Sequence, residues 1–249
     1  MLRAVPALAA LLIAAGAAAQ ERPEWRLEVK RDMVSHGTED EQTKTTLRAE
    51  HFPGGAVALL RLDVPLPDQK QDFQGDPFEP RLGDIKGRIG FRAWTSGELR
   101  FPWFVELTLP TADPESLGTG KYQLGAGQRV IGPVQLPFLG AEHRSAFEAE
   151  VEQVVSFAGD AARKDINTTK LELTLNDLWR GAYTFKLKLK PRIDWVQDGD
   201  TGAVAEVEGG VFFGRLWRAW LMLGTRVWGP DTINGTYKDK VEIGINRTF

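Results

Sequence analysis

Apolar and polar residues alternate along most of the chain with a period of two, and few segments show the 3.6-residue period of a helix. Residues 183–195, YTFKLKLKPRIDW, illustrate the pattern. Their odd positions carry Tyr, Phe, Leu, Leu, Pro, Ile and Trp, whereas the even positions from 186 onward carry three Lys, an Arg and an Asp. Since successive side chains of a strand point to opposite faces, this segment predicts a strand with one apolar and one charged face.

Twelve segments alternate in this way, and turn-forming residues separate them. We therefore predict an all-β fold consisting of a single antiparallel transmembrane β-barrel of about 12 strands. The predicted strands are residues 25–33, 45–51, 56–64, 83–94, 101–109, 120–132, 146–157, 168–178, 183–195, 202–213, 217–228 and 241–249.

The links between these segments alternate in length. The even-numbered links are mostly tight, as at 52–55 and 214–215, and only the link at 133–143 breaks the pattern. Long loops at one rim and short turns at the other are typical of outer-membrane barrels. The alternative is a soluble exported sandwich or barrel whose apolar face is its core. The long links are residues 35–43, 65–82, 110–121, 158–167, 197–202 and 229–239.

The last segment, VEIGINRTF, places Val241, Ile243, Ile245 and Phe249 on one side, together with a single charge, Arg247. An exposed apolar edge strand would promote aggregation. We therefore expect residues 241–249 to pair with residues near 25–33 and close the barrel, with the apolar side facing lipid. Tryptophans near strand ends predict aromatic girdles at the membrane interfaces. They are Trp103, Trp195, Trp217 and Trp228.

Residues 1–19 have the features of a secretory signal peptide, namely an early Arg, an Ala/Leu/Ile run and an A-x-A site. A transmembrane anchor is the alternative, but the apolar run is short. Residues 20–249 then form the exported barrel, located in the outer membrane of a Gram-negative bacterium. The chain has no cysteine, which excludes disulfides. Its formal net charge of −3 and its pI near 5.8 do not suggest a nucleic-acid partner.

If the apolar faces contact lipid, the charged faces line the lumen. One interpretation is a pore whose charged wall sorts solutes. The other, which we favour, is a narrow lumen largely filled by its own ion pairs, since Lys and Arg of 183–195 would lie opposite Glu of 202–213. The candidate lumen and solute-contact residues are Lys86, Arg88, Arg92, Glu148, Glu150, Glu152, Lys186, Lys188, Lys190, Arg192, Glu206 and Glu208.

No enzyme site, metal site or cofactor is predicted. None of the three histidines, His36, His51 and His143, belongs to a nucleophile motif. Ser145 lies two residues from His143, but alternate positions of a strand are about 7 Å apart, which is too far for a nucleophile and its base. The Asp198 and Asp200 pair lacks the spacing of a calcium loop and fits a turn.

The segments RLGDIKGRIGFRAW and FVELTLPTADPESLGTGKYQLGAG, about 45 central residues, resemble the outer-membrane transporter family named for the meta-cleavage pathway of phenol degradation. The family's Gly after Thr111 is Ala112 here. The resemblance implies a barrel more firmly than a cargo and brings no catalytic residues. We interpret the motif as a shaped loop and strand rather than a ligand contact. The matching residues are Gly83, Asp84, Leu109, Pro110, Thr111, Gly118, Thr119, Gly120, Gly125 and Gly127.

Together these patterns predict a passive channel or uptake protein for small molecules, with apolar and aromatic ones among the candidates. The alternatives are a structural barrel that transports nothing and a soluble exported β-protein. The expected partners are outer-membrane lipid, an unidentified small solute and the barrel-assembly machinery. By resemblance to other outer-membrane proteins, Phe249 is the assembly signal that this machinery reads.

Deleting Phe249 is therefore expected to lower the amount of folded barrel in the outer membrane before it affects any other property. The measurement is the amount of folded protein in outer-membrane fractions, relative to total expression. Normal membrane levels of the deletion variant would contradict this role.

Overall fold

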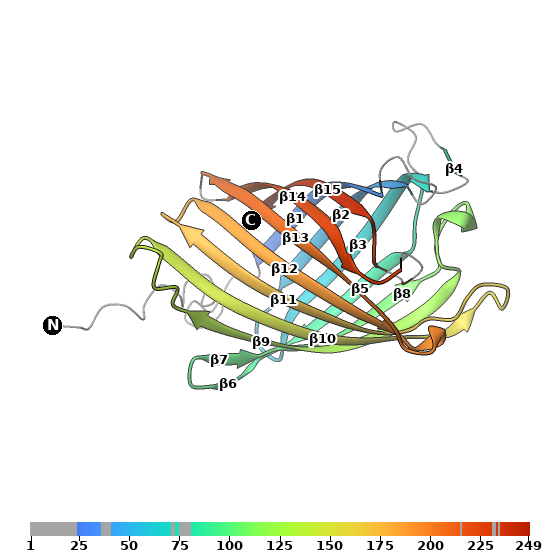
Figure 1. Ribbon diagram of the computed structural model, residues 1–249, viewed down its shortest axis with the longest axis horizontal. Coiled ribbons are helices and arrows are strands. Elements are labelled where there is room, and N and C mark those ends of the chain that lie inside the picture. Colours follow the sequence, from blue (N-terminus) through green and yellow to red (C-terminus); the bar gives the residue numbers. More distant parts are fainter. Residues whose placement is uncertain are drawn as a thin grey trace.

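Twelve antiparallel strands, each hydrogen-bonded to two neighbours, close into a barrel in the computed structural model (Figure 1). The described residues are 24–35, 41–70, 73–74, 81–214, 216–230, 233 and 235–249. The predicted signal peptide and His36 therefore lie outside them. The barrel strands are β1 (Glu24–Val34), β2 (Gln42–Phe52), β3 (Val57–Lys70), β5 (Ile85–Phe91), β8 (Trp103–Leu109), β9 (Lys121–Val134), β10 (His143–Gly159), β11 (Asn167–Trp179), β12 (Tyr183–Asp194), β13 (Asp200–Phe213), β14 (Trp217–Trp228) and β15 (Asp239–Thr248).

The remaining elements are short and extend from the two rims. The hairpin of β6 (Trp94–Ser96) and β7 (Leu99–Phe101) continues β5 and β8 beyond the short-turn rim, and β4 (Phe73–Gln74) pairs with β3 at the other rim. Two 3-10 turns, η1 (Glu115–Leu117) and η2 (Trp195–Gln197), lie in the long links. Within the described residues no helix is long and apolar enough to cross a membrane.

The first and last strands pair with each other, as the sequence predicts. The register of β1 and β15 runs from Arg26 opposite Thr248 to Val34 opposite Lys240. The Phe249 amide adds one hydrogen bond to the Trp25 carbonyl at 2.8 Å. The ring of strands is thereby continuous, and the backbone groups of both strands are paired inside the sheet.

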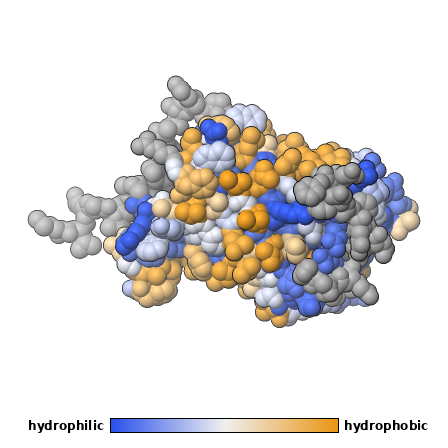
Figure 2. Space-filling view, turned by 90° about the horizontal axis from the view of Figure 1, so that it is seen from above, coloured by the Kyte–Doolittle hydropathy of each residue, from blue (hydrophilic) through white to orange (hydrophobic). Residues whose placement is uncertain are grey.

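The apolar faces of the strands point away from the barrel, and the polar faces point into it. Ile243 is 61% exposed and Leu223 is 53% exposed, whereas Glu50 and Glu206 are only 1% and 2% exposed. Hydrophobic residues cover much of the surface seen in Figure 2. This arrangement does not fit the soluble alternative, in which the apolar faces would form the core. It matches the inverted pattern of a barrel surrounded by lipid.

Aromatic side chains gather near the strand ends on the outer surface. Trp103 stacks on Phe91 with 3.8 Å between ring centroids, and Trp217 lies near the same short-turn rim. Trp195 and Trp228 lie at the long-loop rim. All four predicted girdle tryptophans are exposed, so the prediction of their placement is confirmed.

Arg247, the one charge on the apolar side of β15, lies between two aromatic rings. Its guanidinium carbon is 5.2 Å from the Trp217 ring centroid and 4.6 Å from that of Phe249. A guanidinium over a ring face is stabilised by the ring's negative quadrupole. The aromatic neighbours therefore explain how a charge is tolerated on this face.

Two loop segments of the central motif meet at the long-loop rim: residues 83–84 precede β5, and residues 110–120 link β8 to β9. Thr111 donates its hydroxyl to the Gly83 carbonyl at 2.9 Å and accepts from the Ile85 amide at 3.0 Å. Asp84 accepts from the Thr119 amide at 2.6 Å and from its hydroxyl at 2.8 Å. The motif is thus a hydrogen-bonded clamp that joins the loops flanking β5, β8 and β9.

Gly118 and Gly120 are required by this clamp for different reasons. A Cβ atom on Gly118 would collide with the carboxylate of Asp84 and with the Cβ of Ala112. Gly120 has a φ of +68°, a conformation that other L-residues rarely adopt. Pro110 follows the last residue of β8 and, lacking a donor, cannot continue its ladder.

Gly118→Ala is expected to destabilise the barrel by about 1–3 kcal/mol, because the new methyl group must displace Asp84 or Ala112. The measurement is the midpoint temperature at which the folded, fast-migrating species disappears on detergent gels. Gly209→Ala is the matched control, since a Cβ there meets no atom within 4 Å. Equal midpoints for the two variants would show that the clamp is not tightly packed.

Candidate functional site: the barrel lumen

The basic face of β12 and the acidic face of β13 meet inside the barrel, as predicted. Lys186 lies opposite Glu208 in the register, and Lys188 lies opposite Glu206. The Lys186 Nζ is 3.3 Å from a Glu208 carboxylate oxygen, and the Lys190 Nζ is 2.6 Å from a Glu206 oxygen. The expected cross-strand ion pairs are confirmed, and they neutralise one another across this part of the lumen.

Glu206 is the centre of this cluster. Besides Lys190, its carboxylate has Lys240 at 3.8 Å and Lys188 at 3.9 Å. The hydroxyl of Tyr237 donates a hydrogen bond to it at 2.6 Å. Tyr237 belongs to the link between β14 and β15, and it is only 8% exposed. This loop residue therefore folds into the lumen, a placement that the sequence pattern did not predict.

A second cluster surrounds Arg88 on β5. Its guanidinium lies 2.8 Å from Glu106, 3.6 Å from Glu152 and 3.7 Å from Glu150. The same group stacks over the Phe104 ring at 3.8 Å. Arg88, Glu150 and Glu152 were predicted to face the lumen, whereas Glu106 was not singled out.

Neighbouring cations share the carboxylates of β10. Lys170 on β11 is 3.1 Å from Glu152, and Arg129 on β9 is 3.4 Å from Glu148. Arg129 also pairs with Glu150. Lys170 and Arg129 were not among the predicted residues, although each lies on the polar side of its strand.

A third cluster involves the first three strands, none of whose charges was selected from the sequence. Glu50 pairs with Arg26 and lies 2.8 Å from Arg61. Arg48 reaches Asp63 at 2.6 Å. These strands alternate as the others do, so the same pattern contained this signal.

Three predicted lumen residues differ from the others. Arg92 lies beyond the end of β5 and is exposed, because the strand ends at Phe91 and the chain turns into the β6–β7 hairpin. Its predicted place in the lumen was therefore wrong. Lys86 and Arg192 lie on the polar sides of β5 and β12, but they make no ion pair within the described part of the chain. Contact between any of these residues and a solute stays a prediction.

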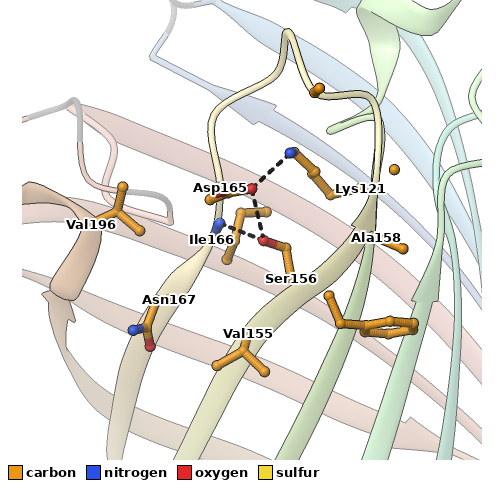
Figure 3. Close-up of a pocket in the computed structure, with 11 residues that line it drawn as sticks. Lys121, Val155, Ser156, Ala158, Asp165, Ile166, Asn167 and Val196 are labelled. Atoms are coloured by element: carbon orange, nitrogen blue, oxygen red, sulfur yellow. Dashed lines mark hydrogen bonds and ion pairs between the residues drawn. The ribbon is translucent and has the colours of Figure 1, made fainter.

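A pocket of 700 Å³ lies at the long-loop rim, between the upper parts of β10 and β11 (Figure 3). Lys121 reaches Asp165 of the loop at 2.7 Å, and Ser156 accepts a hydrogen bond from the Ile166 amide at 2.9 Å. The hydrogen bond from Lys121 holds the pKa of Asp165 below its ordinary value. The contacts tie the loop to β9 and β10, and Phe157 and Val196 add apolar lining.

Ser145 and His143 do not contact each other as a nucleophile and base would. Instead both bind Asp177 of β11, the Ser145 hydroxyl donating at 2.7 Å and His143 Nδ1 lying at 2.7 Å. In a serine nucleophile, the hydroxyl donates its hydrogen bond to an imidazole, which acts as the base. Here the Ser145 hydroxyl donates to the Asp177 carboxylate instead, so His143 is not placed to act as that base. Within the described residues, no group of three or more His, Asp or Glu is placed to hold a metal ion.

No protein-family model matches this sequence, and no curated relative matches it. Solved structures do share its fold. The KdgM porin is 9% identical, with a TM-score of 0.59 over 90% of this chain and 99% of that one. An outer membrane channel from Pseudomonas putida F1 is 12% identical, with a TM-score of 0.57 over 91% of this chain and 95% of that one. The NanC porin is 6% identical, with a TM-score of 0.58 over 90% of this chain and 98% of that one.

These similarities agree with the closed ring of strands. At such low identities they concern the fold alone. The chain has the antiparallel twelve-stranded barrel fold of outer-membrane channels.

Glu206→Gln is expected to destabilise the barrel strongly, by about 3–5 kcal/mol, because it leaves a cluster of lysines short of a carboxylate. Tyr237→Phe removes only one hydrogen bond to the same group and should cost about 1 kcal/mol. The midpoint temperature of the gel-mobility shift measures both effects. If Glu206→Gln melts no earlier than Tyr237→Phe, the charge of Glu206 does not hold this cluster together.

Proposed function

We propose that the protein is an outer-membrane channel through which small solutes pass passively. The observation that carries this proposal is the opposite polarity of the two faces of the closed barrel, apolar outside and charged inside. Such a barrel is stable in lipid and encloses a polar path across it. The similarity in fold to two porins and an outer membrane channel supports the same function.

The width of the path is limited by the charged side chains. A twelve-stranded barrel is narrower than the porins of sixteen or eighteen strands, and ion pairs occupy much of its inner surface. Solutes that pass are therefore small. The same filling favours one rival, a structural barrel that transports nothing.

The resemblance to the transporter family named for the meta-cleavage pathway of phenol degradation is retained as part of the proposal. It is supported by the way Asp84, Thr111 and Thr119 of the shared motif bind one another's loops. On this basis, small aromatic or apolar molecules are the leading candidates for the solute. An enzymatic role is not proposed, because Ser145 and His143 each bind Asp177.

Export and assembly complete the proposal. Residues 1–19 would direct the chain across the inner membrane and be removed, leaving residues 20–249 as one barrel domain. The barrel-assembly machinery would then insert it into the outer membrane, with Phe249 as the recognised residue.

The purified barrel in planar lipid bilayers is expected to show discrete conductance steps. Replacing Lys186, Lys188 and Lys190 with Glu should shift ion preference toward cations, because three positive charges of the lumen become negative. Boiled protein is the control for detergent artefacts. A folded barrel that is electrically silent, and that does not admit small sugars into liposomes, would favour the structural barrel.

A further inference from the structure

Among the described residues of the lumen, Lys86 and Arg192 differ from the other cations, which have carboxylates within ion-pair distance. Both occupy inward-facing positions, in register with inward residues of the neighbouring strands: Lys86 with Asp63, and Arg192 with Lys170. Neither has a carboxylate oxygen within ion-pair distance among the described residues. The Nε atom of Arg192 is buried and has no hydrogen-bond partner. Its guanidinium therefore has donor capacity that nothing in the described chain satisfies.

The two residues come from distant parts of the ring of strands. Between β5 and β12 lie four strands on one side, β8, β9, β10 and β11. Even so, Arg192 lies directly opposite Lys170 in the register of β11 and β12, and Lys86 is near enough for its charge to act on Lys170 as well. Lys170 therefore has a second cation beside it and a third facing it from another wall of the lumen.

Carboxylates lie near this convergence, but each has a nearer cation. Glu152 pairs with Lys170 at 3.1 Å, and Glu106 pairs with Arg88 at 2.8 Å. Glu172 and Glu206, whose charges also act on Arg192, lie within 4 Å of Lys190. Among the described residues, no carboxylate is therefore left to form an ion pair with Lys86 or Arg192.

Elsewhere in the lumen, the charge of a lysine is compensated by two carboxylates. Lys190 has both Glu206 and Glu172 within 4 Å, and Lys240 has both Glu206 and Glu242. A partly buried charge without a partner is costly, and an anion that binds between two such charges removes the cost. Guanidinium and ammonium groups together match the oxygens of a carboxylate.

We propose that Lys86, Lys170 and Arg192 form a cross-lumen basic site that binds the carboxylate of a small organic anion. A role of this site in permeation rests on the proposed channel function. Binding of the anion does not, because it depends only on the charges of these three residues. Among the aromatic candidates for the solute, the site therefore favours those that carry a carboxylate.

The test is calorimetric titration of benzoate into the full folded chain in detergent micelles. Benzyl alcohol, which has the same ring and no charge, is the neutral comparison. The wild-type barrel is expected to bind benzoate, and the Lys86→Gln/Arg192→Gln variant to bind it at least about tenfold more weakly, since two charge-assisted contacts are lost. Each single substitution gives the same comparison if the double variant does not fold.

The matched control is the Arg61→Gln/Lys240→Gln variant, which also removes one arginine and one lysine from the lumen. The carboxylates that lose Arg61 and Lys240 in this variant still have another cation, because Glu50 remains paired with Arg26 and Glu242 with Lys30. Its benzoate affinity should stay within about twofold of the wild type, since these residues lie outside the proposed site.

Three results would overturn the site: no benzoate binding by the wild type, equal affinity in the Lys86→Gln/Arg192→Gln variant, or equally tight binding of benzyl alcohol. An equal loss in the control variant would do the same, because it would mean that overall lumen charge matters rather than these positions. Failure of the channel is a separate outcome. A conducting barrel that ignores benzoate rejects the site, whereas a silent barrel that binds benzoate at these residues rejects permeation.

Discussion

The structure depends on one constraint: in lipid, every backbone donor and acceptor of a strand needs a partner inside the sheet. Pairing of β1 with β15 satisfies this constraint, because it removes both edges of the sheet at once. Closure then fixes the direction of every side chain, since residues alternate between the outer surface and the lumen. The apolar surface, the aromatic belts and the charged interior are all consequences of that alternation.

Placing charge inside a narrow barrel creates a second problem, namely its neutralisation. Most of the chain solves it through register, as when Lys186 and Lys188 of β12 lie directly opposite Glu208 and Glu206 of β13. Such pairs hold adjacent strands together and narrow the path at the same time. The ion pairs of the lumen therefore stabilise the molecule, and the same lumen is its candidate site. Lys86 and Arg192 form no such ion pair among the described residues, so they belong to the candidate site alone.

The sequence predicts the strands and their faces well because a period of two is a local property. All twelve predicted segments overlap a barrel strand, and the closing partner of residues 241–249 follows from the need to leave no edge. It predicts less well where contacts are formed by links. Arg92 was misplaced because the end of β5 depends on a hairpin, and Tyr237 was missed because no periodicity marks a loop that folds inward.

In the candidate site, too, contacts between adjacent strands could be predicted from the sequence, whereas contacts across the lumen could not. Facing residues on adjacent strands could be inferred from register, so the pairing of Lys186 with Glu208 was accessible from sequence. Which charges converge across the lumen depends on strand tilt and barrel closure, and these are global properties. For that reason Lys86 and Arg192 could be predicted to face inward but not to lack partners.

Successive residues of each barrel strand face lipid and lumen in turn, and this alternation can be measured directly on β15. The chain has no cysteine, so single cysteines can be introduced at positions 241, 242, 243, 245 and 246 and labelled with a nitroxide in lipid vesicles. Collisions with dissolved oxygen are expected to be frequent for labels at 241, 243 and 245 and rare at 242 and 246. Uniform accessibility along β15, or the opposite alternation, would contradict it.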